Sequence, residues 1–245
     1  MTGLKALIAT DDFDFLDFGC SKGGSLQFGK SFFGGHRGLG VDIDPQKVET
    51  TRALGLDAVE GDVTQLNLPD NSVSFVLMLD FLEHLSGFDL ARRAIASACR
   101  VAKDFVFIRH PWFDADGALM EHRLKFYWSD WHGHPNNFGQ LSFYRALARS
   151  KNVHQWMLFG QDRVTDSHSP DLLPLDAPID LPAIAAEVAQ ARPMVEFNFK
   201  AYRQITCLIQ INPDYPIQTI VDRLPRSELL FTSGAGDRSL SRPES

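Results

Sequence analysis

The sequence predicts an α/β fold, in which helices cover both faces of a doubly wound, mostly parallel β-sheet. The first observation behind this prediction is a short apolar run at residues 13–18, which leads into a glycine-rich turn and a helix start at Ser25. The second is the alternation of short apolar runs with helical segments along most of the chain. Folds of this kind bind their ligands beyond the carboxyl ends of the parallel strands.

Several segments have the length and composition of strands. The run at 73–79 is apolar apart from Ser74, which predicts a central strand buried on both faces. The other expected strands cover residues 13–18, 38–43, 58–60, 104–108, 153–159 and 202–211.

Helical segments separate these strands. Apolar residues recur at helical spacing over 89–102, with arginines on the opposite side. A helix at 26–33 ends at Gly34-Gly35, and a helix at 46–54 follows Asp44 and Pro45, a typical helix start. We also expect helices at 1–10, 137–150 and 181–191.

The turn after the first strand has the features of a ligand-binding loop. Gly19 and Gly23 permit backbone conformations that let a ligand approach closely. Ser21 occupies the second glycine position of a dinucleotide motif, and Lys22 is not followed by the Ser or Thr of a Walker loop. Asp17 would repel a phosphate but could receive an ammonium group. The turn therefore predicts a zwitterionic nucleoside ligand without phosphate.

The sequence FLDFGCSKGG at residues 15–24 resembles the first motif of the class I S-adenosylmethionine-dependent methyltransferases. That motif is a hydrophobic run followed by Asp/Glu-x-Gly-x-Gly-x-Gly, and Ser21 departs from it. The resemblance covers about residues 13–159 and implies a Rossmann-like sheet of seven strands with the last one antiparallel. It also implies S-adenosylmethionine as the cofactor, with Asp17, Gly19, Cys20 and Gly23 at its binding loop.

Acidic residues at two later strand ends extend this resemblance. GVDIDP resembles the second motif, which implies that Asp42 binds the ribose hydroxyls beside Ile43. GDVTQLNLPDNSVSFV resembles the third region, in which Asp62 accepts from the adenine amino group and the N–H of Val63 pairs with the ring. The alternative for both carboxylates is capping of a helix or turn.

The fourth expected strand ends at Leu79 and Asp80, which the resemblance places beside the methionine part of the cofactor. The LEHL sequence that follows resembles the helix start after this strand in many small-molecule methyltransferases. It implies that His84 lies near the substrate mouth. The alternative is a histidine on a helix surface.

An aromatic segment at 112–138 interrupts the alternation. It contains Trp112, Trp128 and Trp131 together with His132 and His134. It follows the fifth strand, where this superfamily places substrate-recognition inserts. Aromatic walls with a few polar groups form small-molecule pockets, although a small core inside the insert is the alternative. We predict that the insert covers the acceptor pocket and that His132 or His134 reaches the acceptor.

A hydroxyl acceptor requires a base, and histidine has a suitable pKa. The candidate catalytic residues are His84, His132 and His134, and His110 is a further candidate for the base. The spacing of His132 and His134 is also compatible with a metal. No cysteine pair or HExxH helix accompanies them, so we predict no metal site.

We expect one methyltransferase domain over residues 1–212, with a proline-rich loop at 165–182, and a C-terminal extension at 213–245 with a mobile end. The net charge of −7 argues against a nucleic-acid partner. Three scattered cysteines indicate a reducing cytoplasm. No apolar run has the length of a membrane span.

The expected activity is methyl transfer from S-adenosylmethionine to a small-molecule acceptor, at oxygen. One alternative is N-methylation of an amine or a protein side chain, for which Asp80, Asp114 or Asp130 would supply an acidic pocket. Another is a non-catalytic module that only binds the cofactor. A nicotinamide dehydrogenase is disfavoured by the glycine spacing.

Overall fold

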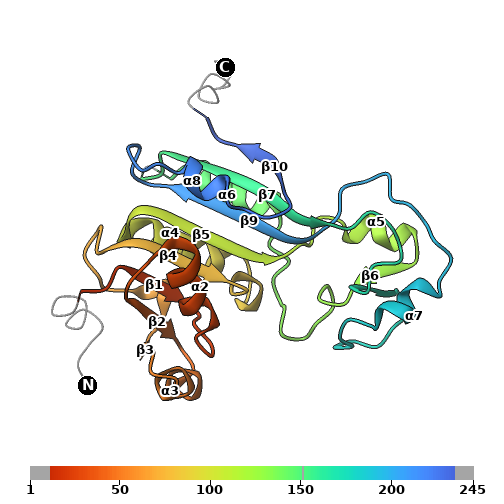
Figure 1. Cartoon of the computed structure of the whole chain (residues 1–245), viewed down its shortest axis with the longest axis horizontal. Coiled ribbons are helices and arrows are strands. Elements are labelled where there is room, and N and C mark those ends of the chain that lie inside the picture. Colours follow the sequence, from red (N-terminus) through yellow and green to blue (C-terminus); the bar gives the residue numbers. More distant parts are fainter. Residues whose placement is uncertain (1–11, 151, 235–245) are drawn as a thin grey trace.

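Strands and helices alternate through the first part of the chain (Figure 1). The computed structural model describes residues 12–150 and 152–234. Two single 3₁₀ turns, η1 (Val63–Gln65) and η2 (Leu82–His84), follow the third and fourth strands. In chain order the other elements are β1 (Phe15–Phe18), α2 (Gly24–Phe33), β2 (Gly38–Asp42), α3 (Pro45–Ala53), β3 (Asp57–Glu60), β4 (Val73–Leu79), α4 (Phe88–Val101) and β5 (Ala102–Pro111).

The second part of the chain mixes short helices with antiparallel strands. Its elements are α5 (Asp116–Glu121), β6 (Leu124–Phe126), α6 (Gln140–Leu147), β7 (Gln155–Arg163), β8 (Leu172–Pro174), α7 (Ala186–Gln190), β9 (Tyr202–Gln210), α8 (Gln218–Val221) and β10 (Ser227–Thr232).

The main sheet has the strand order β10-β7-β9-β5-β4-β1-β2-β3. Strands β1 to β5 are parallel, β9 is antiparallel to both β5 and β7, and β10 is antiparallel to β7. The predicted α/β fold with a mostly parallel sheet and an antiparallel strand near its end is therefore confirmed.

The predicted number of seven strands is wrong, because the sheet has eight. The additional strand is β10, which pairs with β7 at the sheet edge. Its side chains are half-buried or exposed, so its sequence lacks the apolar pattern of an interior strand. Phe231 stacks on Trp156 of β7 with ring centroids 4.6 Å apart, a contact that sequence periodicity does not reveal.

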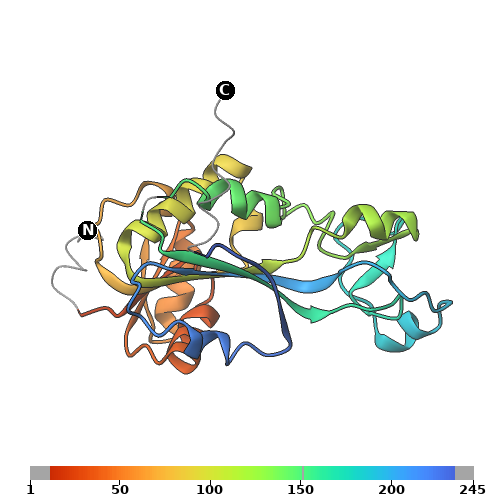
Figure 2. The same ribbon diagram turned by 90° about the horizontal axis from the view of Figure 1, so that it is seen from above.

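Helices cover both faces of the sheet, as Figure 2 shows for the yellow and green helices above it and the red and blue helices below it. Buried residues of α4 and α6 share one hydrophobic cluster with one face, and those of α2, α3 and α8 share a second cluster with the other. In the second cluster the ring of Phe75 stacks on Phe15 and Phe105, at 4.7 and 4.9 Å between centroids. Much of the phenylalanine in this chain is therefore core.

The insert and the proline-rich segment together form a small lobe beside the sheet (Figure 1), made of residues 112–138 and 165–200. Strand β6 of the insert pairs with β8 of the proline-rich segment, which is thus more than an extended loop. Trp128 stacks on Phe126 at 4.3 Å, and its indole N–H donates to the carbonyl oxygen of Trp112 at 2.8 Å. The lobe therefore contains a small aromatic core, as the alternative interpretation expected.

The expected helix at 1–10 and most of the expected mobile end lie outside the described residues. Within 12–150 and 152–234, no helix combines the length and the apolar character that crossing a membrane requires.

Candidate cofactor and acceptor site

Strands β1 and β4 are neighbours in the sheet, but the chain leaves them toward helices on opposite faces. This arrangement opens a crevice beyond their carboxyl ends, where α/β folds bind ligands. The loop after β1 and the residues after β4 border this crevice. The N–H of Gly19 donates to the carbonyl oxygen of Val41 at 2.8 Å, and that of Asp80 donates to Arg109 at 2.7 Å, so both segments are fixed by their neighbouring strands.

Gly19 has a positive φ of 75°, and a Cβ atom there would lie 2.2 Å from the ring of Phe81. Glycine is thus required by conformation and by space. Ser21, which departs from the family motif, also has a positive φ, of 46°. Its carbonyl oxygen accepts from the Thr51 hydroxyl at 2.8 Å, and its N–H donates to Asp42 at 2.9 Å. These contacts hold the serine in a conformation that glycine ordinarily supplies.

Two of the predicted cofactor residues, Asp17 and Gly23, pack beneath the loop and do not line the cavities that are described below. Asp17 is fully buried and accepts a hydrogen bond from the Ser25 hydroxyl, whereas its Oδ1 atom has no partner. Burial raises the pKa of Asp17 to about 7. Gly23 packs against Leu56, and a Cβ there would meet that side chain at 2.6 Å. Asp17 and Gly23 thus shape the loop from below.

A cavity of ≈ 310 Å³ adjoins the loop, and we call it the adenosine cavity because it is lined by the residues expected to bind that part of the cofactor. Asp42 lies in its wall, and its two carboxylate oxygens accept from the N–H groups of Ser21 and Asp44 at 2.9 and 3.0 Å. Each oxygen keeps a second lone pair for a ribose hydroxyl. Ile43 is 72% exposed and offers an apolar surface to a base. The cavity is lined by Gly19, Asp42, Ile43, Asp62, Val63, Asp80 and their neighbours.

Two other carboxylates, those of Asp44 and Asp62, cap helices. Asp44 caps α3 by accepting from the N–H of Gln46 at 2.9 Å. Asp62 accepts from the N–H and the hydroxyl of Thr64, at 2.9 and 2.7 Å, and so caps η1. Asp62 still borders the adenosine cavity next to Val63. Capping and adenine recognition are therefore compatible for Asp62.

A second cavity, of ≈ 470 Å³, adjoins the loop on the side of Cys20, Leu79 and Asp80. Lys22 and Arg109 bring positive charge to its wall. The Nε atom of Arg109 is buried without a hydrogen-bond partner, so an anionic group fits beside it. These residues suit the carboxylate of a methionine. Arg109 was not predicted from the sequence as a site residue, although it is a cation near the end of β5, in register with Leu79 at the end of β4.

Cys20 itself is a structural residue. Its side chain is 1% exposed and lies against Gly40, where an added Cβ would meet its sulfur at 2.5 Å. Burial raises the pKa of the Cys20 thiol to about 12, which keeps it protonated and unreactive.

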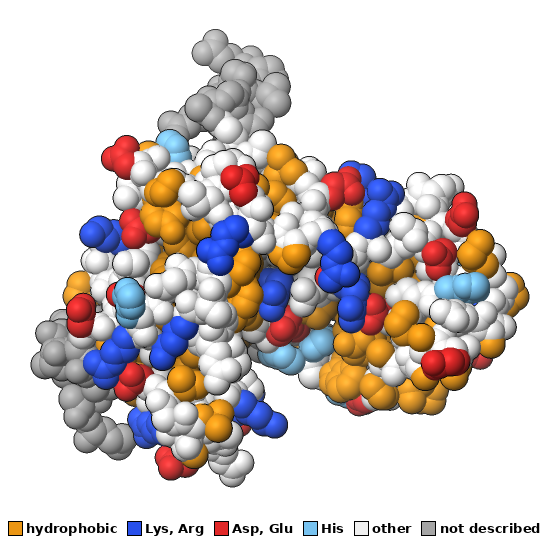
Figure 3. Space-filling view, in the orientation of Figure 1, with side chains coloured by type: hydrophobic (Ala, Val, Ile, Leu, Met, Phe, Trp, Pro, Cys, Tyr) orange, Lys and Arg blue, Asp and Glu red, His pale blue; other side chains and the backbone are white. Residues whose placement is uncertain are grey.

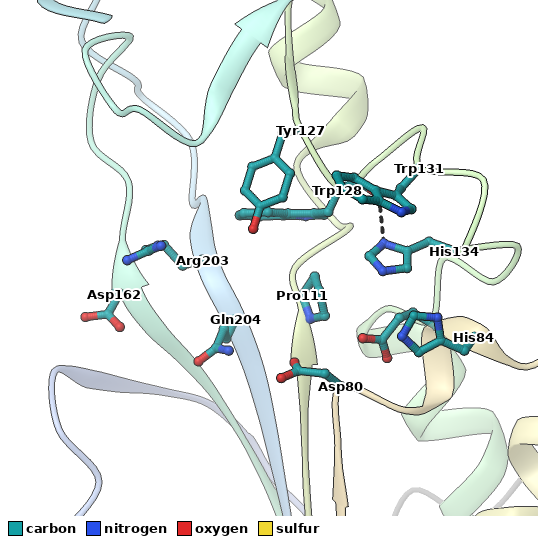
Figure 4. A pocket seen from close by; sticks show the side chains of 11 residues that line it. Asp80, His84, Pro111, Tyr127, Trp128, Trp131, His134, Asp162, Arg203 and Gln204 are labelled. Atoms are coloured by element: carbon teal, nitrogen blue, oxygen red, sulfur yellow. Dashed lines mark hydrogen bonds between the residues drawn. The ribbon is translucent and has the colours of Figure 1, made fainter. Parts of the chain in front are cut away.

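A third cavity, of ≈ 520 Å³, lies between the sheet and the lobe and is visible as a hollow in Figure 3. We call it the acceptor cavity after the ligand expected there. Figure 4 shows aromatic side chains of the lobe above it and polar side chains from the strand ends below. Asp80 and His84 border this cavity and both cofactor cavities. The lining consists of Asp80, Glu83, His84, Pro111, Tyr127, Trp128, Trp131, His134, Asp162, Arg203 and Gln204.

Two predicted histidines meet at this cavity (Figure 4). The Nδ1 atom of His84 lies 2.6 Å from the carbonyl oxygen of Gly133, and that of His134 lies 3.0 Å from Trp128. Because a carbonyl only accepts, each Nδ1 carries a proton, and in the neutral tautomer of such a ring the lone pair is on Nε2. The two ring centroids are 5.0 Å apart. Burial lowers the pKa of His134, which favours its neutral form.

The other two histidine candidates lie elsewhere. The Nδ1 atom of His132 lies 2.5 Å from Asp180, and its exposed side chain does not line the acceptor cavity. His110 is fully buried, with Nδ1 donating to the carbonyl oxygen of Pro111 at 2.8 Å. Burial lowers the pKa of His110 to about 4, so it is a neutral core residue.

Glu83 is a site residue that the sequence analysis missed. Its side chain is 1% exposed, and its Oε2 atom has no hydrogen-bond partner. Burial, and then the charge of Asp80, raise the pKa of Glu83 to about 8. The turn η2 directs Glu83 inward, and Asn136 holds it there, since its amide donates to the carbonyl oxygen of Leu82 at 2.9 Å.

Residues 16–106 match a family model described as a methyltransferase domain. Among solved structures, the chain is similar to a SAM-dependent methyltransferase from Archaeoglobus fulgidus, with 18% identity and a TM-score of 0.56 over 80% of this chain and 85% of that one. A SAM-dependent methyltransferase from Methanosarcina mazei shares 13% identity, with a TM-score of 0.51 over 81% and 92% of the two chains. A Thermotoga maritima protein described as a SAM-dependent methyltransferase, possible histamine N-methyltransferase, shares 14% identity, with a TM-score of 0.50 over 82% and 84%.

The search of curated proteins gave no match. At these sequence identities, the similar structures show the fold. The family model extends from β1 to the first half of β5, and this region carries the glycine loop and the acidic strand ends. Residues 16–106 thus form a methyltransferase domain, and the chain has the fold of S-adenosylmethionine-dependent methyltransferases.

Proposed function

We propose that this enzyme methylates a hydroxyl oxygen of a small, ring-bearing acceptor. The observation that carries the proposal is that Asp80 and His84 border the acceptor cavity and both cofactor cavities. Donor and acceptor would thus meet at these two residues. Holding two reactants in line is a large contribution of a protein to such a transfer.

The cofactor supplies a methyl group that its sulfonium already activates. The chain therefore has to bind the two reactants, align them and exclude water. We assign the ribose hydroxyls to Asp42 and the adenine edge to Asp62 and Val63. Lys22 and Arg109 receive the methionine carboxylate. Positions of these residues in the walls of the two cofactor cavities support the assignment.

The acceptor lies between aromatic side chains of the lobe. Tyr127, Trp128 and Trp131 line the cavity, and flat aromatic walls favour a planar ring as ligand. Glu83, His84 and His134 also line the cavity, each with one ligand atom within 4.8 Å of those of the other two, and we name these three residues the Glu–His cluster. This cluster is where the hydroxyl proton is withdrawn.

An amine acceptor is the second candidate. Three carboxylates, Asp80, Glu83 and Asp162, line the acceptor cavity together with the guanidinium of Arg203, so an ammonium group would find anionic partners. The name of the Thermotoga maritima protein also refers to an amine. Asp114 and Asp130, which the sequence suggested for this role, do not line the cavity.

A panel assay with methyl-labelled S-adenosylmethionine tests the proposal. The full chain is incubated with phenols, catechols and matched aromatic amines, and the products are identified by mass spectrometry. We expect label on hydroxyl oxygens of the ring-bearing acceptors. Label on amine nitrogens alone would replace the proposal by the second candidate. Saturable cofactor binding without label on any hydroxyl would overturn it.

A further inference from the structure

We infer that Glu83, His84 and His134 bind a divalent transition-metal ion, which holds the acceptor oxygen in the cavity. One ligand atom from each residue lies within 4.8 Å of the ligand atoms of the other two. The three come from η2 and from the lobe, which the fold brings together. The role toward the acceptor rests on the proposed O-methylation, whereas the ion site rests on the cluster alone.

The hydrogen bonds of both histidines orient them as metal ligands. His84 donates its Nδ1 proton to the backbone carbonyl of Gly133. His134 donates its own to the backbone carbonyl of Trp128 (Figure 4). A metal-binding histidine typically uses its second nitrogen in this way, because the bond fixes the tautomer and the ring direction. Both Nε2 lone pairs therefore remain available to one ion.

The third ligand is a buried carboxylate that lacks a partner. Glu83 is 1% exposed, and its Oε2 atom has no hydrogen bond. In the described part of the chain, neither Glu83 nor Asp80 beside it forms a salt bridge. A buried oxygen without a partner is unfavourable, and a bound cation would supply the missing partner.

The ligand set indicates the class of ion. Two imidazole nitrogens and one carboxylate oxygen suit Zn²⁺, Co²⁺, Mn²⁺ or Fe²⁺, and this combination leaves coordination positions open for an acceptor oxygen. Mg²⁺ and Ca²⁺ prefer oxygen ligands. Ligand atoms at about 2.1 Å from one ion lie within about 4.2 Å of each other. Binding one ion therefore requires the ligand atoms of the cluster to move together by about an ångström. The exposed His84 side chain has the freedom for such a shift.

Coordination explains how the hydroxyl would lose its proton. An oxygen bound to the ion has a lowered pKa, so its O–H bond breaks and the proton passes to water in the open cavity. The resulting oxyanion forms the new bond to the methyl carbon. The bond from that carbon to sulfur breaks with its electron pair remaining on sulfur, which becomes a neutral thioether. The ion keeps its oxidation state throughout.

The sequence pointed to a different pair, His132 and His134, and predicted no metal. The structure separates these two, because His132 turns to Asp180 while His134 faces the cavity. His132 is therefore a matched control, a histidine on the same segment outside the cluster.

Cobalt binding to the full chain tests the site directly. The protein is treated with chelator, dialysed and titrated with Co²⁺, and the visible absorption of bound Co²⁺ is followed together with the protein's melting temperature. We expect one bound ion per chain. Glu83→Gln and His84→Ala should each weaken binding at least tenfold, and His132→Ala should not change it. His84→Ala removes an exposed side chain, so it serves if Glu83→Gln fails to fold.

The outcomes separate the site from the proposed function. Absence of bound Co²⁺, or equal binding by wild type and His84→Ala, would overturn the ion site whatever the acceptor is. If Co²⁺ binds as expected, methylation should fall at least tenfold after chelation and return with Zn²⁺, Co²⁺ or Mn²⁺. Full turnover of a hydroxylated acceptor by the chelated enzyme would overturn the role of the ion and leave O-methylation intact.

Discussion

The Nδ1 atom of His84 lies 2.6 Å from the carbonyl oxygen of Gly133, and this contact ties the turn after β4 to the lobe. The turn η2 belongs to the crevice that receives the cofactor, whereas Gly133 belongs to the segment that covers the acceptor cavity. One histidine therefore connects the two halves of the site. Under the proposed function, this connection holds donor and acceptor in line.

Replacing His134 by Asn tests the role of the Glu–His cluster. We expect turnover to fall about a hundredfold or more while the affinity for the cofactor is unchanged, because His134 lines only the acceptor cavity of the three. Steady-state kinetics and cofactor titration measure the two effects. The matched His132→Asn variant should keep wild-type turnover. Equal losses in the two variants would move the proton-withdrawing group away from the cluster.

Asp42→Ala should weaken cofactor binding by about 1–3 kcal/mol, through loss of charge-assisted hydrogen bonds to the ribose. Calorimetric titration with S-adenosylhomocysteine measures this. Asp44→Ala, two residues away, is the control, because Asp44 caps α3. That variant should lose about 1 kcal/mol of stability without a change in affinity. Wild-type affinity in Asp42→Ala would show that Asp42 only orders the loop.

Gly19→Ala should lower cofactor affinity at least tenfold. The new Cβ would lie 2.2 Å from the ring of Phe81, a residue that lines the adenosine cavity, and must displace it. Gly55 has the same φ of 75° with nothing within 4 Å, so Gly55→Ala isolates the conformational strain of about 1–2 kcal/mol. Melting temperatures and cofactor titrations of both variants separate strain from displacement. If Gly19→Ala and Gly55→Ala bound the cofactor with equal affinity, displacement of Phe81 would have no effect on binding.

Much of the fold could be predicted because its signals are local. Strand β4 begins and ends where its apolar run does, and glycine marks the ends of α2 and α3. Strand β10 could not be predicted in this way. None of its residues is buried, and the contact of Phe231 with Trp156 joins segments far apart in the sequence.

The site residues also differ in whether local sequence or tertiary structure determines their positions. Asp42, Asp62 and Asp80 stand at strand ends, and the common direction of parallel strands brings them to one edge of the sheet. Arg109 and Glu83 were missed, because their directions follow from strand register and from a single 3₁₀ turn. The choice between His132 and His134 likewise depends on Asp180, which belongs to a distant segment.

The buried carboxylate of Asp17 predicts a pH dependence of stability. Its pKa is about 7 in the folded chain and near 3.8 in the unfolded one, so the folded chain binds the extra proton between these values. The free energy of unfolding should therefore fall as the pH rises from about 4 to about 7. Asp17→Asn removes this loss, so the variant should gain about 2–3 kcal/mol relative to wild type between about pH 5 and pH 8. Urea unfolding of both cofactor-free proteins measures the gain, and a difference independent of pH would contradict it.

Two tryptophans of the lobe should respond differently to truncation. Trp131 lines the acceptor cavity, so Trp131→Ala should raise the KM for the acceptor about tenfold with little loss of stability. Trp112 is 2% exposed, so Trp112→Ala should cost about 3–5 kcal/mol of unfolding free energy. Acceptor kinetics and chemical unfolding distinguish the two. A large stability loss in Trp131→Ala would assign that residue to the lobe core.

A crystal structure of the full chain with S-adenosylhomocysteine tests the central claim most directly. The account predicts ribose hydroxyls on Asp42, the amino acid carboxylate beside Lys22 and Arg109, and the sulfur at Asp80 and His84, open to the acceptor cavity. A ligand whose sulfur faces away from the cavity lined by Trp131 and His134, or one bound outside the crevice of β1 and β4, would contradict it.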